Sequence, residues 1–485
     1  MRRAVKYDLL VIGGGINGAG IARDAAGRGL ATLLVERADL ASATSSASSK
    51  LIHGGLRYLE QYEFRLVHEA LAEREILLRI AGHLVWPTRF VIPHVPELRP
   101  RWMIRLGLFL YDHLARRSVL PASQPVRLDA PPYSSGLRPG LKHGFVYADC
   151  RVDDARLVVV NALDAARRGA RVLVRTECVA ARRQNGAWHV RLSNGEGLEV
   201  RAIVNAAGPW VKKVLDERLH QSSADAVRLV KGSHIVVPRL YDGDHAFITQ
   251  NVDGRVVFII PYEDQFTLIG TTDVATEDLE AGGPDTEEVD YLCRAVARYF
   301  AQPVDRAKVV WSYAGVRPLH DDGTRDPSAV TRDYALRLYD EGGAPVLSVF
   351  GGKITTYRRL GEQVLQQLAR YFPAMKGRWT DREPLPGSNF ASRTEAQQRV
   401  FARYRDLPEE VVRGVFRRHG ELAEEVLGDG LTGEHYGGGL TERELRYLVA
   451  REWAASAEDV LWRRTKCGLH MSAAQRTRVA EALGR

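Results

Sequence analysis

The pattern of apolar and polar positions near the start of the chain predicts a strand, a helix and a second strand. Residues 7–12 form a short apolar run that ends at Gly13, and residues 19–28 have the spacing of a helix. Residues 32–35 are typical of a buried strand, which ends at Glu36. We therefore expect a βαβ unit at the start of the chain.

Later segments predict elements that return to this first unit. Residues 151–168 have the pattern of an amphipathic helix, and residues 42–120 predict several helices. The expected returning strands lie at residues 171–175, 188–192, 199–204 and from 346 onward, the last being followed by a helix at 356–371.

A second sheet and a terminal helical region are also expected. Between about residues 228 and 311, alternating segments at 233–237, 256–260 and 266–269 predict an antiparallel sheet. The turn-rich residues 384–388 are typical of a linker. Beyond that linker, helices are expected at residues 395–404, 408–419, 441–452 and 472–483.

Composition and charge restrict the class of protein without choosing a function. The 485 residues are 26% charged and 45% apolar, as in globular proteins, and a net charge of +8 favours anionic partners. The four cysteines lie far apart, so neither a metal cluster nor a disulfide framework is expected, and no metal site is predicted. We also expect no secretory signal and no membrane-spanning run.

The glycines of the first unit predict a dinucleotide site. Gly13, Gly15 and Gly18 follow a strand and open a helix, where they permit a tight turn, backbone approach to a diphosphate and close helix packing. The helix N-terminus attracts the diphosphate, and Glu36 suits the ribose hydroxyls. A glycine-rich turn without a ligand is disfavoured because the whole βαβ context agrees.

Two further glycine-bearing segments favour FAD over NAD. Residues 205–210, Asn-Ala-Ala-Gly-Pro-Trp, follow an expected strand, and residues 351–356, Gly-Gly-Lys-Ile-Thr-Thr, open a late helix. A long cofactor needs contacts from distant parts of the chain, whereas NAD domains are usually contiguous. Either segment alone is also compatible with a structural turn.

The chain resembles the FAD-dependent glycerol-3-phosphate dehydrogenases at residues 7–18 with Glu36, 45–58, 205–210, 312–318 and 351–358. That family lies within the D-amino-acid-oxidase-like flavoproteins. Residues 48–58, Ser-Ser-Lys-Leu-Ile-His-Gly-Gly-Leu-Arg-Tyr, carry the most specific part of the resemblance, and residues 451–465 resemble the family's helical C-terminal domain.

The resemblance implies an α/β fold with a Rossmann-like FAD-binding domain, an antiparallel-sheet substrate domain and a helical C-terminal domain. We expect the first two to interleave over residues 1–383, with FAD-domain returns at 171–210 and 346–372, and the third to cover 384–485. The implied cofactor-binding residues are Gly13, Gly15, Asn17, Gly18, Glu36, Arg37, Thr44, Ser45, Ser49, Lys50, Leu51, His53, Val179, Ala207, Gly208, Gly352, Lys353, Ile354 and Thr355.

The implied reaction is oxidation of sn-glycerol 3-phosphate to dihydroxyacetone phosphate. Such a reaction needs a base for the hydroxyl proton and cations for the phosphate, and arginine suits phosphate because its planar fork donates two parallel hydrogen bonds. Arg57, Arg317 and Lys353 are the expected cations, with surface charge as the alternative.

His53 is the preferred base and His234 the alternative, since either ring accepts protons near neutral pH. Each of them is also compatible with a structural histidine. Arg317 is also able to polarise the hydroxyl, so we count it with the catalytic candidates. Tyr58 and Thr271 are further expected substrate neighbours.

The stretch from Arg99 to Arg117 suits a lipid headgroup boundary, because arginines flank an aromatic and aliphatic centre. A buried helix with charged ends is the alternative. The resemblance implies a homodimer bound to the cytoplasmic face of the cell membrane, with an anionic lipid surface and a membrane quinone as partners.

Rival functions remain at this point. A peroxide-forming glycerophosphate oxidase shares the same motifs, and only the products distinguish it from a quinone reductase. Amine oxidases are disfavoured by residues 48–58, and a multi-subunit anaerobic form by the missing C-terminal cysteine cluster. A nucleic-acid-binding role is disfavoured as well, since no recognised motif for it appears despite a pI of about 9.3.

Overall fold

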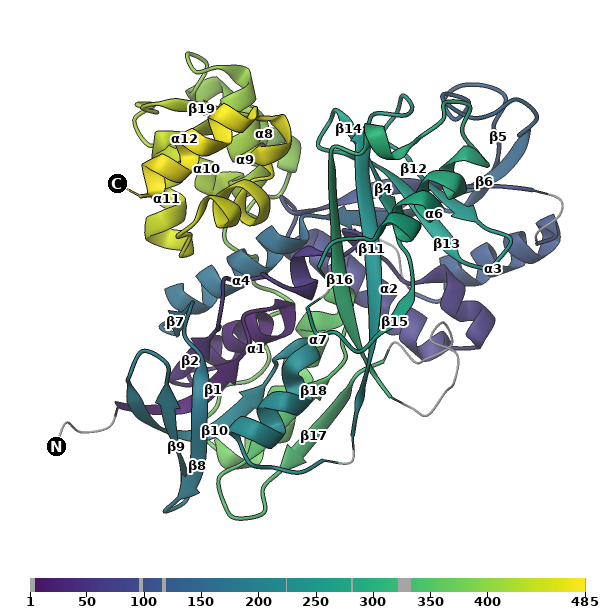
Figure 1. Ribbon diagram of the computed structural model, residues 1–485. Coiled ribbons are helices and arrows are strands. Elements are labelled where there is room, and N and C mark those ends of the chain that lie inside the picture. Colours follow the sequence, from purple (N-terminus) through teal and green to yellow (C-terminus); the bar gives the residue numbers. More distant parts are fainter. Residues whose placement is uncertain are drawn as a thin grey trace.

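The computed structural model describes residues 5–95, 99–115, 119–223, 225–280, 282–321 and 333–484. Two large sheets lie side by side, and a helical unit formed by the C-terminal residues packs beside them (Figure 1). The predicted α/β fold with a helical C-terminal domain is confirmed. Among the described residues, no helix is long and apolar enough to cross a bilayer.

The first sheet contains the predicted βαβ unit. Its strands run in the order β17-β18-β10-β1-β2-β7, and β8 and β9 extend it beside β10. The neighbours of β1 and β2 are parallel, as a Rossmann-like sheet requires. The strands are β1 (Val5–Ile12), β2 (Thr32–Val35), β7 (Arg171–Leu173), β8 (Cys178–Gln184), β9 (Ala187–Leu192), β10 (Gly197–Asn205), β17 (Ala335–Tyr339) and β18 (Val346–Phe350).

Three helices pack together against this sheet. They are α1 (Ile16–Gly27), α4 (Asp154–Arg167) and α7 (Tyr357–Leu368), and their apolar faces belong to one buried cluster. The helix expected at 151–168 begins later, because Arg151 and Val152 belong to strand β6. Asp153 caps the helix by accepting a hydrogen bond from the Arg156 backbone amide.

The second sheet is the predicted antiparallel one, but it recruits strands from the first third of the chain. It runs β15-β11-β14-β13-β12-β4-β6-β3, with β16 beside β11 and β5 beside β6. The strands are β3 (Leu51–Ile52), β4 (Val85–Pro93), β5 (Gln124–Arg127), β6 (His143–Val152), β11 (Val227–Pro238), β12 (Ala246–Gln250), β13 (Val256–Tyr262), β14 (Phe266–Gly270), β15 (Val274–Thr276) and β16 (Trp311–His320). Among the strands described here for this sheet, only β4 and β12 pair in parallel.

Helices α2 (Phe64–Ile80), α3 (Arg101–His113) and α6 (Thr286–Ala297) flank the second sheet, and the short α5 (Val211–Lys213) follows β10. Helix α3 lies at the far end of the molecule from the C-terminal helices (Figure 1). It buries only a narrow side formed by Leu108, Tyr111 and Asp112.

The C-terminal unit has a hydrophobic core of its own. Its helices are α8 (Arg393–Arg403), α9 (Glu409–His419), α10 (Ala423–Leu427), α11 (Glu442–Glu452) and α12 (Ala473–Leu483), with a two-stranded sheet formed by β19 (His435–Gly437) and β20 (Leu440–Thr441). A short π-helical turn, η9 (Asp459–Arg464), lies against the βαβ unit. The four helices predicted for this region are present, each beginning within two residues of the expected start.

Candidate active site

A cavity of about 1040 Å³ lies between the two sheets. Loops after β1, β2, β10 and β18 form one side of it, and strands β11 and β16 form the other. The carboxyl ends of parallel strands are where ligands bind in open α/β sheets, so the first sheet places the cavity as expected.

The glycine-rich loop lies at one end of this cavity. Gly13 has φ +112°, and a Cβ there would lie 2.5 Å from the Ala206 carbonyl oxygen. A Cβ at Gly18 would lie 1.8 Å from the Gly13 oxygen, so Gly18 serves the packing of α1 against the loop without lining the cavity. Gly15, at the start of α1, carries no side-chain cap and lines the cavity. The Ile16 amide donates to Ser45 Oγ at 3.0 Å, so the N-terminus of α1 borders the cavity with one of its donors already paired.

Glu36 connects the glycine-rich loop to the end of β2. Its carboxylate accepts hydrogen bonds from the Gly14 amide at 2.6 Å and the Ala38 amide at 2.8 Å. Burial raises the pKa of Glu36, and these two amides partly offset the increase. Since Glu36 also lines the cavity, the position is compatible with the predicted ribose contact.

The structure brings most of the other expected cofactor residues to the same cavity. Gly18, Lys50 and Val179 are the exceptions, since they do not line it. Lys50 lies beneath the cavity wall, where its ammonium group pairs with Asp154 at 3.0 Å. The expected residues that line the cavity are Gly13, Gly15, Asn17, Glu36, Arg37, Thr44, Ser45, Ser49, Leu51, His53, Ala207, Gly208, Gly352, Lys353, Ile354 and Thr355.

Two facing glycines leave a hollow in the face of the second sheet that lines the cavity. In the β11–β16 register, Gly232 lies opposite Gly315, and His234 lies opposite Tyr313. Arg317 follows on the same face as Gly315, because alternate residues of a strand share a face. A Cβ at Gly232 would lie 2.2 Å from Arg317 Nη2 and 2.7 Å from Thr271 Oγ1. The hollow is therefore the space into which Arg317 and Thr271 extend.

Two cations reach this part of the cavity. Arg317 donates to the Thr272 carbonyl at 2.9 Å and pairs with Asp273 at 2.8 Å, and its side chain remains 30% exposed. Lys353 Nζ lies 4.0 Å from the centre of the Tyr58 ring. Arg57 is half-buried on the turn before Tyr58 and does not line the cavity.

Both candidate histidines line the cavity in environments that favour the neutral ring. Burial lowers the pKa of His53 to about 4, assisted by Lys353 and Arg74. Burial also lowers the pKa of His234 well below its ordinary value, assisted by Lys50 and Arg317. The His234 ring is held between Ser49 Oγ, 2.9 Å from Nε2, and the stacked Tyr313 ring. Its Nδ1 has no hydrogen-bond partner among the described residues.

Several cavity residues were not singled out from the sequence. Trp311 and Tyr313 line the second-sheet side, and Glu458, Trp462 and Arg463 reach the cavity from the C-terminal unit. Trp311 directly precedes the segment 312–318, which carries part of the family resemblance. Its position next to this segment is a signal from which it could have been predicted. The three C-terminal residues lie within the segment 451–465 that resembles the family's C-terminal domain, but their place at the cavity depends on how that unit docks.

The residues present fit a dinucleotide with a reactive ring system. The glycine-rich loop borders the cavity, and the buried Asn17 Oδ1 and His234 Nδ1 lack partners among the described residues. Both residues line the cavity, Asn17 from α1 and His234 from β11. The arrangement suits a cofactor that extends from the βαβ unit to the hollow of the second sheet.

Comparison with known proteins agrees with this geometry. Residues 8–358 match the family model of FAD dependent oxidoreductases, and residues 378–484 match that of the C-terminal domain of alpha-glycerophosphate oxidase. The chain belongs to the FAD-dependent oxidoreductase family, and its cofactor is FAD.

Individual relatives cover nearly the whole chain. A glycerol-3-phosphate dehydrogenase of Pseudomonas aeruginosa is 53% identical, covering 98% of this chain and 95% of its own length. A D-erythritol 1-phosphate dehydrogenase of Brucella abortus is 52% identical, with 98% and 97% covered. The solved structure of the Bacillus halodurans glycerol-3-phosphate dehydrogenase with FAD has a TM-score of 0.73 at 27% identity, covering 99% of this chain and 94% of that one.

Proposed function

We propose that this enzyme oxidises sn-glycerol 3-phosphate to dihydroxyacetone phosphate and passes the electrons to a membrane quinone. FAD, when bound, supplies the hydride acceptor for the carbinol carbon. The hollow at Gly232 and Gly315 is the observation that carries the proposal, because it collects a phosphate-binding cation and a neutral imidazole on one sheet face. A relative of 53% identity with this named activity supports it.

The chain's own residues suit the two tasks that the substrate imposes. Arg317 and Lys353 supply positive charge at the cavity, and the planar guanidinium of Arg317 suits a phosphate. His53 and His234 are unprotonated at neutral pH, so either ring is able to accept the hydroxyl proton. Arg57 does not line the cavity, whereas the adjacent Tyr58 does, and the phosphate contact of Arg57 stays a prediction.

We keep His53 as the proposed base and His234 as the alternative. The exposed part of His53 favours it, whereas the unpartnered Nδ1 favours His234. Replacing the base by asparagine should slow flavin reduction by roughly 100-fold or more while FAD remains bound. Stopped-flow reduction of His53→Asn and His234→Asn measures this directly. A loss of less than about tenfold removes that histidine from the role.

The relative of 52% identity makes D-erythritol 1-phosphate a second candidate substrate. Both compounds are polyol phosphates, so the same cations and base serve either one. The deciding experiment is a comparison of kcat/KM for the two compounds with a soluble dye as acceptor. The proposal expects at least a tenfold preference for glycerol 3-phosphate, and the opposite preference would overturn it.

Helix α3 supports the proposed membrane surface. Its exposed residues include Trp102 at 66%, Leu106 at 51% and Phe109 at 50%, which opposes the alternative of a buried helix. Arg101 and Arg105 are exposed on the same helix. Apolar residues beside arginines suit the boundary of an anionic lipid layer. Arg116 and Arg117, which belong to the predicted stretch, lie outside the described residues.

The buried side of α3 leads directly to the cavity. Tyr111 Oη accepts a hydrogen bond from the Gly54 amide at 2.8 Å and donates to Asp149 at 2.6 Å. Gly54 follows His53, which lines the cavity. A lipid-soluble acceptor that reaches α3 would therefore be close to the redox site, which supports a quinone at the inner face of the cell membrane.

Separate experiments test whether oxygen is the electron acceptor and whether the protein is a homodimer. A quinone reductase should form little hydrogen peroxide in air and should reduce a quinone analogue in vesicles. Rapid peroxide formation with no quinone reduction would instead identify an oxidase. The homodimer implied by the resemblance remains a prediction, which sedimentation of the detergent-free protein checks.

A further inference from the structure

The C-terminal unit forms part of the wall of the cofactor cavity. Glu458, Trp462 and Arg463, on and beside the turn η9, line the same cavity as the glycine-rich loop. The Trp462 ring stacks on Trp311 with centroids 4.8 Å apart. The wall therefore contains residues separated by more than 400 positions from the glycines of the βαβ unit.

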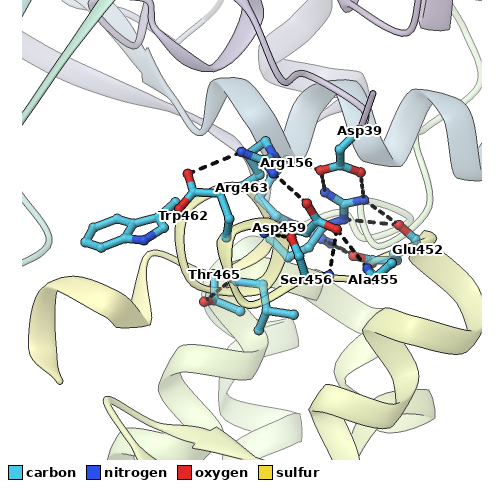
Figure 2. A network of polar contacts seen from close by, with 12 residues as sticks. Asp39, Arg156, Glu452, Ala455, Ser456, Asp459, Trp462, Arg463 and Thr465 are labelled. Atoms are coloured by element: carbon cyan, nitrogen blue, oxygen red, sulfur yellow. Dashed lines mark hydrogen bonds and ion pairs between the residues drawn. The ribbon is translucent and has the colours of Figure 1, made fainter. Parts of the chain in front are cut away.

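A buried ion-pair network joins η9 to the loop after β2. Arg464 donates two hydrogen bonds to the Asp39 carboxylate, both at 2.7 Å, and Arg463 donates a third at 2.7 Å. Asp39 and Arg464 are 3% and 0% exposed, so these contacts are shielded from solvent. Figure 2 shows this network, with Asp39 of the βαβ unit and Asp459 and Arg463 of the C-terminal unit among its members.

A second connection to the same loop is made by Arg175, which follows β7. The Arg175 amide donates to the Ala38 carbonyl at 2.7 Å, and the Arg175 side chain pairs with Asp459. Asp459 also accepts hydrogen bonds from the Ala455 and Ser456 amides, which fix it within the C-terminal unit. The loop after β2 is thus clamped on both sides by one turn of the C-terminal unit.

The clamped loop is the one that supports the glycine-rich turn. Glu36, three residues before Asp39, holds the Gly14 amide, and the Ala41 amide donates to the Gly14 carbonyl at 3.1 Å. Movement of Asp39 would therefore be transmitted to both polar groups of the Gly14 backbone. The chain of contacts runs from Arg464 through Asp39 to the diphosphate-binding loop.

We propose that docking of the C-terminal unit through Asp39, Arg463 and Arg464 positions the FAD-binding loop, so that cofactor binding and C-terminal docking stabilise each other. Asp39 and the two arginines are positioning residues, while Trp462 closes the cavity beside Trp311. The coupling is reciprocal, because two linked equilibria must shift each other by the same factor. It rests on the FAD assignment alone and not on the substrate or acceptor.

The first test measures FAD affinity in Asp39→Asn and in a matched control, Glu263→Gln. Glu263 is also a buried carboxylate that pairs with an arginine across the domain boundary, Arg417, but it does not line the cavity. Apoprotein is titrated with FAD and flavin fluorescence is followed. We expect the Kd for FAD to rise at least tenfold in Asp39→Asn and less than threefold in Glu263→Gln.

Two outcomes of this titration would overturn the proposal. One is a change below threefold in Asp39→Asn, and the other is an equal change in both variants, which would indicate general loosening of the C-terminal unit. Asp39→Asn leaves a buried Arg464 without its counter-charge and risks misfolding. In that case Arg464→Gln, which leaves Asp39 paired with Arg463 and does not line the cavity, decides by the same threshold against the same control.

A second measurement examines the reverse direction of the coupling. Limited proteolysis of the full wild-type chain at the segment 378–392 is compared with and without excess FAD. We expect FAD to slow release of the C-terminal fragment at least fivefold relative to cleavage elsewhere, and we expect Asp39→Asn to lose this protection. Equal release with and without FAD in the wild type would overturn the reciprocal coupling.

Discussion

At the residue scale, glycines decide where the charged groups of the site lie, because they leave room for the neighbouring side chains. Arg317 and Thr271 extend over Gly232, which has no Cβ to exclude them, and the facing Gly315 lies against Ala47. Since residues of a packed interior are placed to within a few tenths of an ångström, this hollow accepts little change.

Gly232→Ala should displace Arg317, because the added methyl carbon would lie 2.2 Å from Nη2. We expect kcat/KM to fall by roughly 100-fold or more, corresponding to about 3 kcal/mol of lost transition-state stabilisation, while FAD content stays near that of the wild type. Gly197→Ala is the control, because a Cβ there meets no atom within 4 Å. Wild-type kinetics in Gly232→Ala would remove Arg317 from the substrate site.

The two histidines predict an unusual pH dependence. Burial lowers the pKa of His53 to about 4 and that of His234 well below its ordinary value, so both rings remain able to accept a proton below the ordinary histidine pKa of about 6.5. The limiting rate of flavin reduction at saturating substrate should therefore be flat from about pH 8 to about pH 5.5. A fall in that rate with a midpoint near 6.5 would contradict the buried neutral base.

The same shift has a consequence for stability with a defined sign. Below about pH 6.5 the two histidines bind protons in the unfolded state but remain neutral in the folded state. The contribution of these groups to the free energy of unfolding is thus fully present above that pH and is lost as the pH falls toward the folded pKa, about 4 for His53.

At the element scale, the periodic segments were predictable and their long-range partners were not. The strands β1, β2, β13 and β14 begin and end close to the expected residues, because each has a strong local pattern of apolar positions. Strands β4 and β6 were not anticipated, since the pairing of β4 with β12 and with β6 is decided by tertiary packing. The start of α4 was misplaced although Asp153, a good N-cap residue, marks it.

Helix α3 carries the prediction for the membrane at this scale. Changing Arg101 and Arg105 to glutamate should weaken binding to anionic vesicles, most clearly at low salt, since each arginine contributes on the order of 1 kcal/mol at such a surface. Activity with a soluble dye should persist. Flotation with vesicles measures binding, and Arg382→Glu, at an arginine 84% exposed, is the control. Undiminished flotation would assign membrane binding to another surface.

At the scale of the whole molecule, the cavity exists because three parts of the chain meet. Glycine content was sufficient to identify the glycine-rich loop and the late loop 351–356, and the family resemblance identified the segment 48–58; all three contribute residues to the cavity. Glu458, Trp462 and Arg463 have no such composition, and only docking of the C-terminal unit brings them to the cavity. Arg57 shows the converse, since it belongs to a specific motif and yet lies off the cavity.

The central claim is that this cavity holds FAD next to a site for glycerol 3-phosphate. The most direct test is an anaerobic titration of the purified holoenzyme with sn-glycerol 3-phosphate, followed by the absorbance of the oxidised flavin. The account predicts that the yellow colour bleaches as substrate is added, that dihydroxyacetone phosphate appears in equal amount, and that a quinone analogue restores the colour. A fully flavin-loaded protein whose spectrum stays oxidised with excess glycerol 3-phosphate would contradict it.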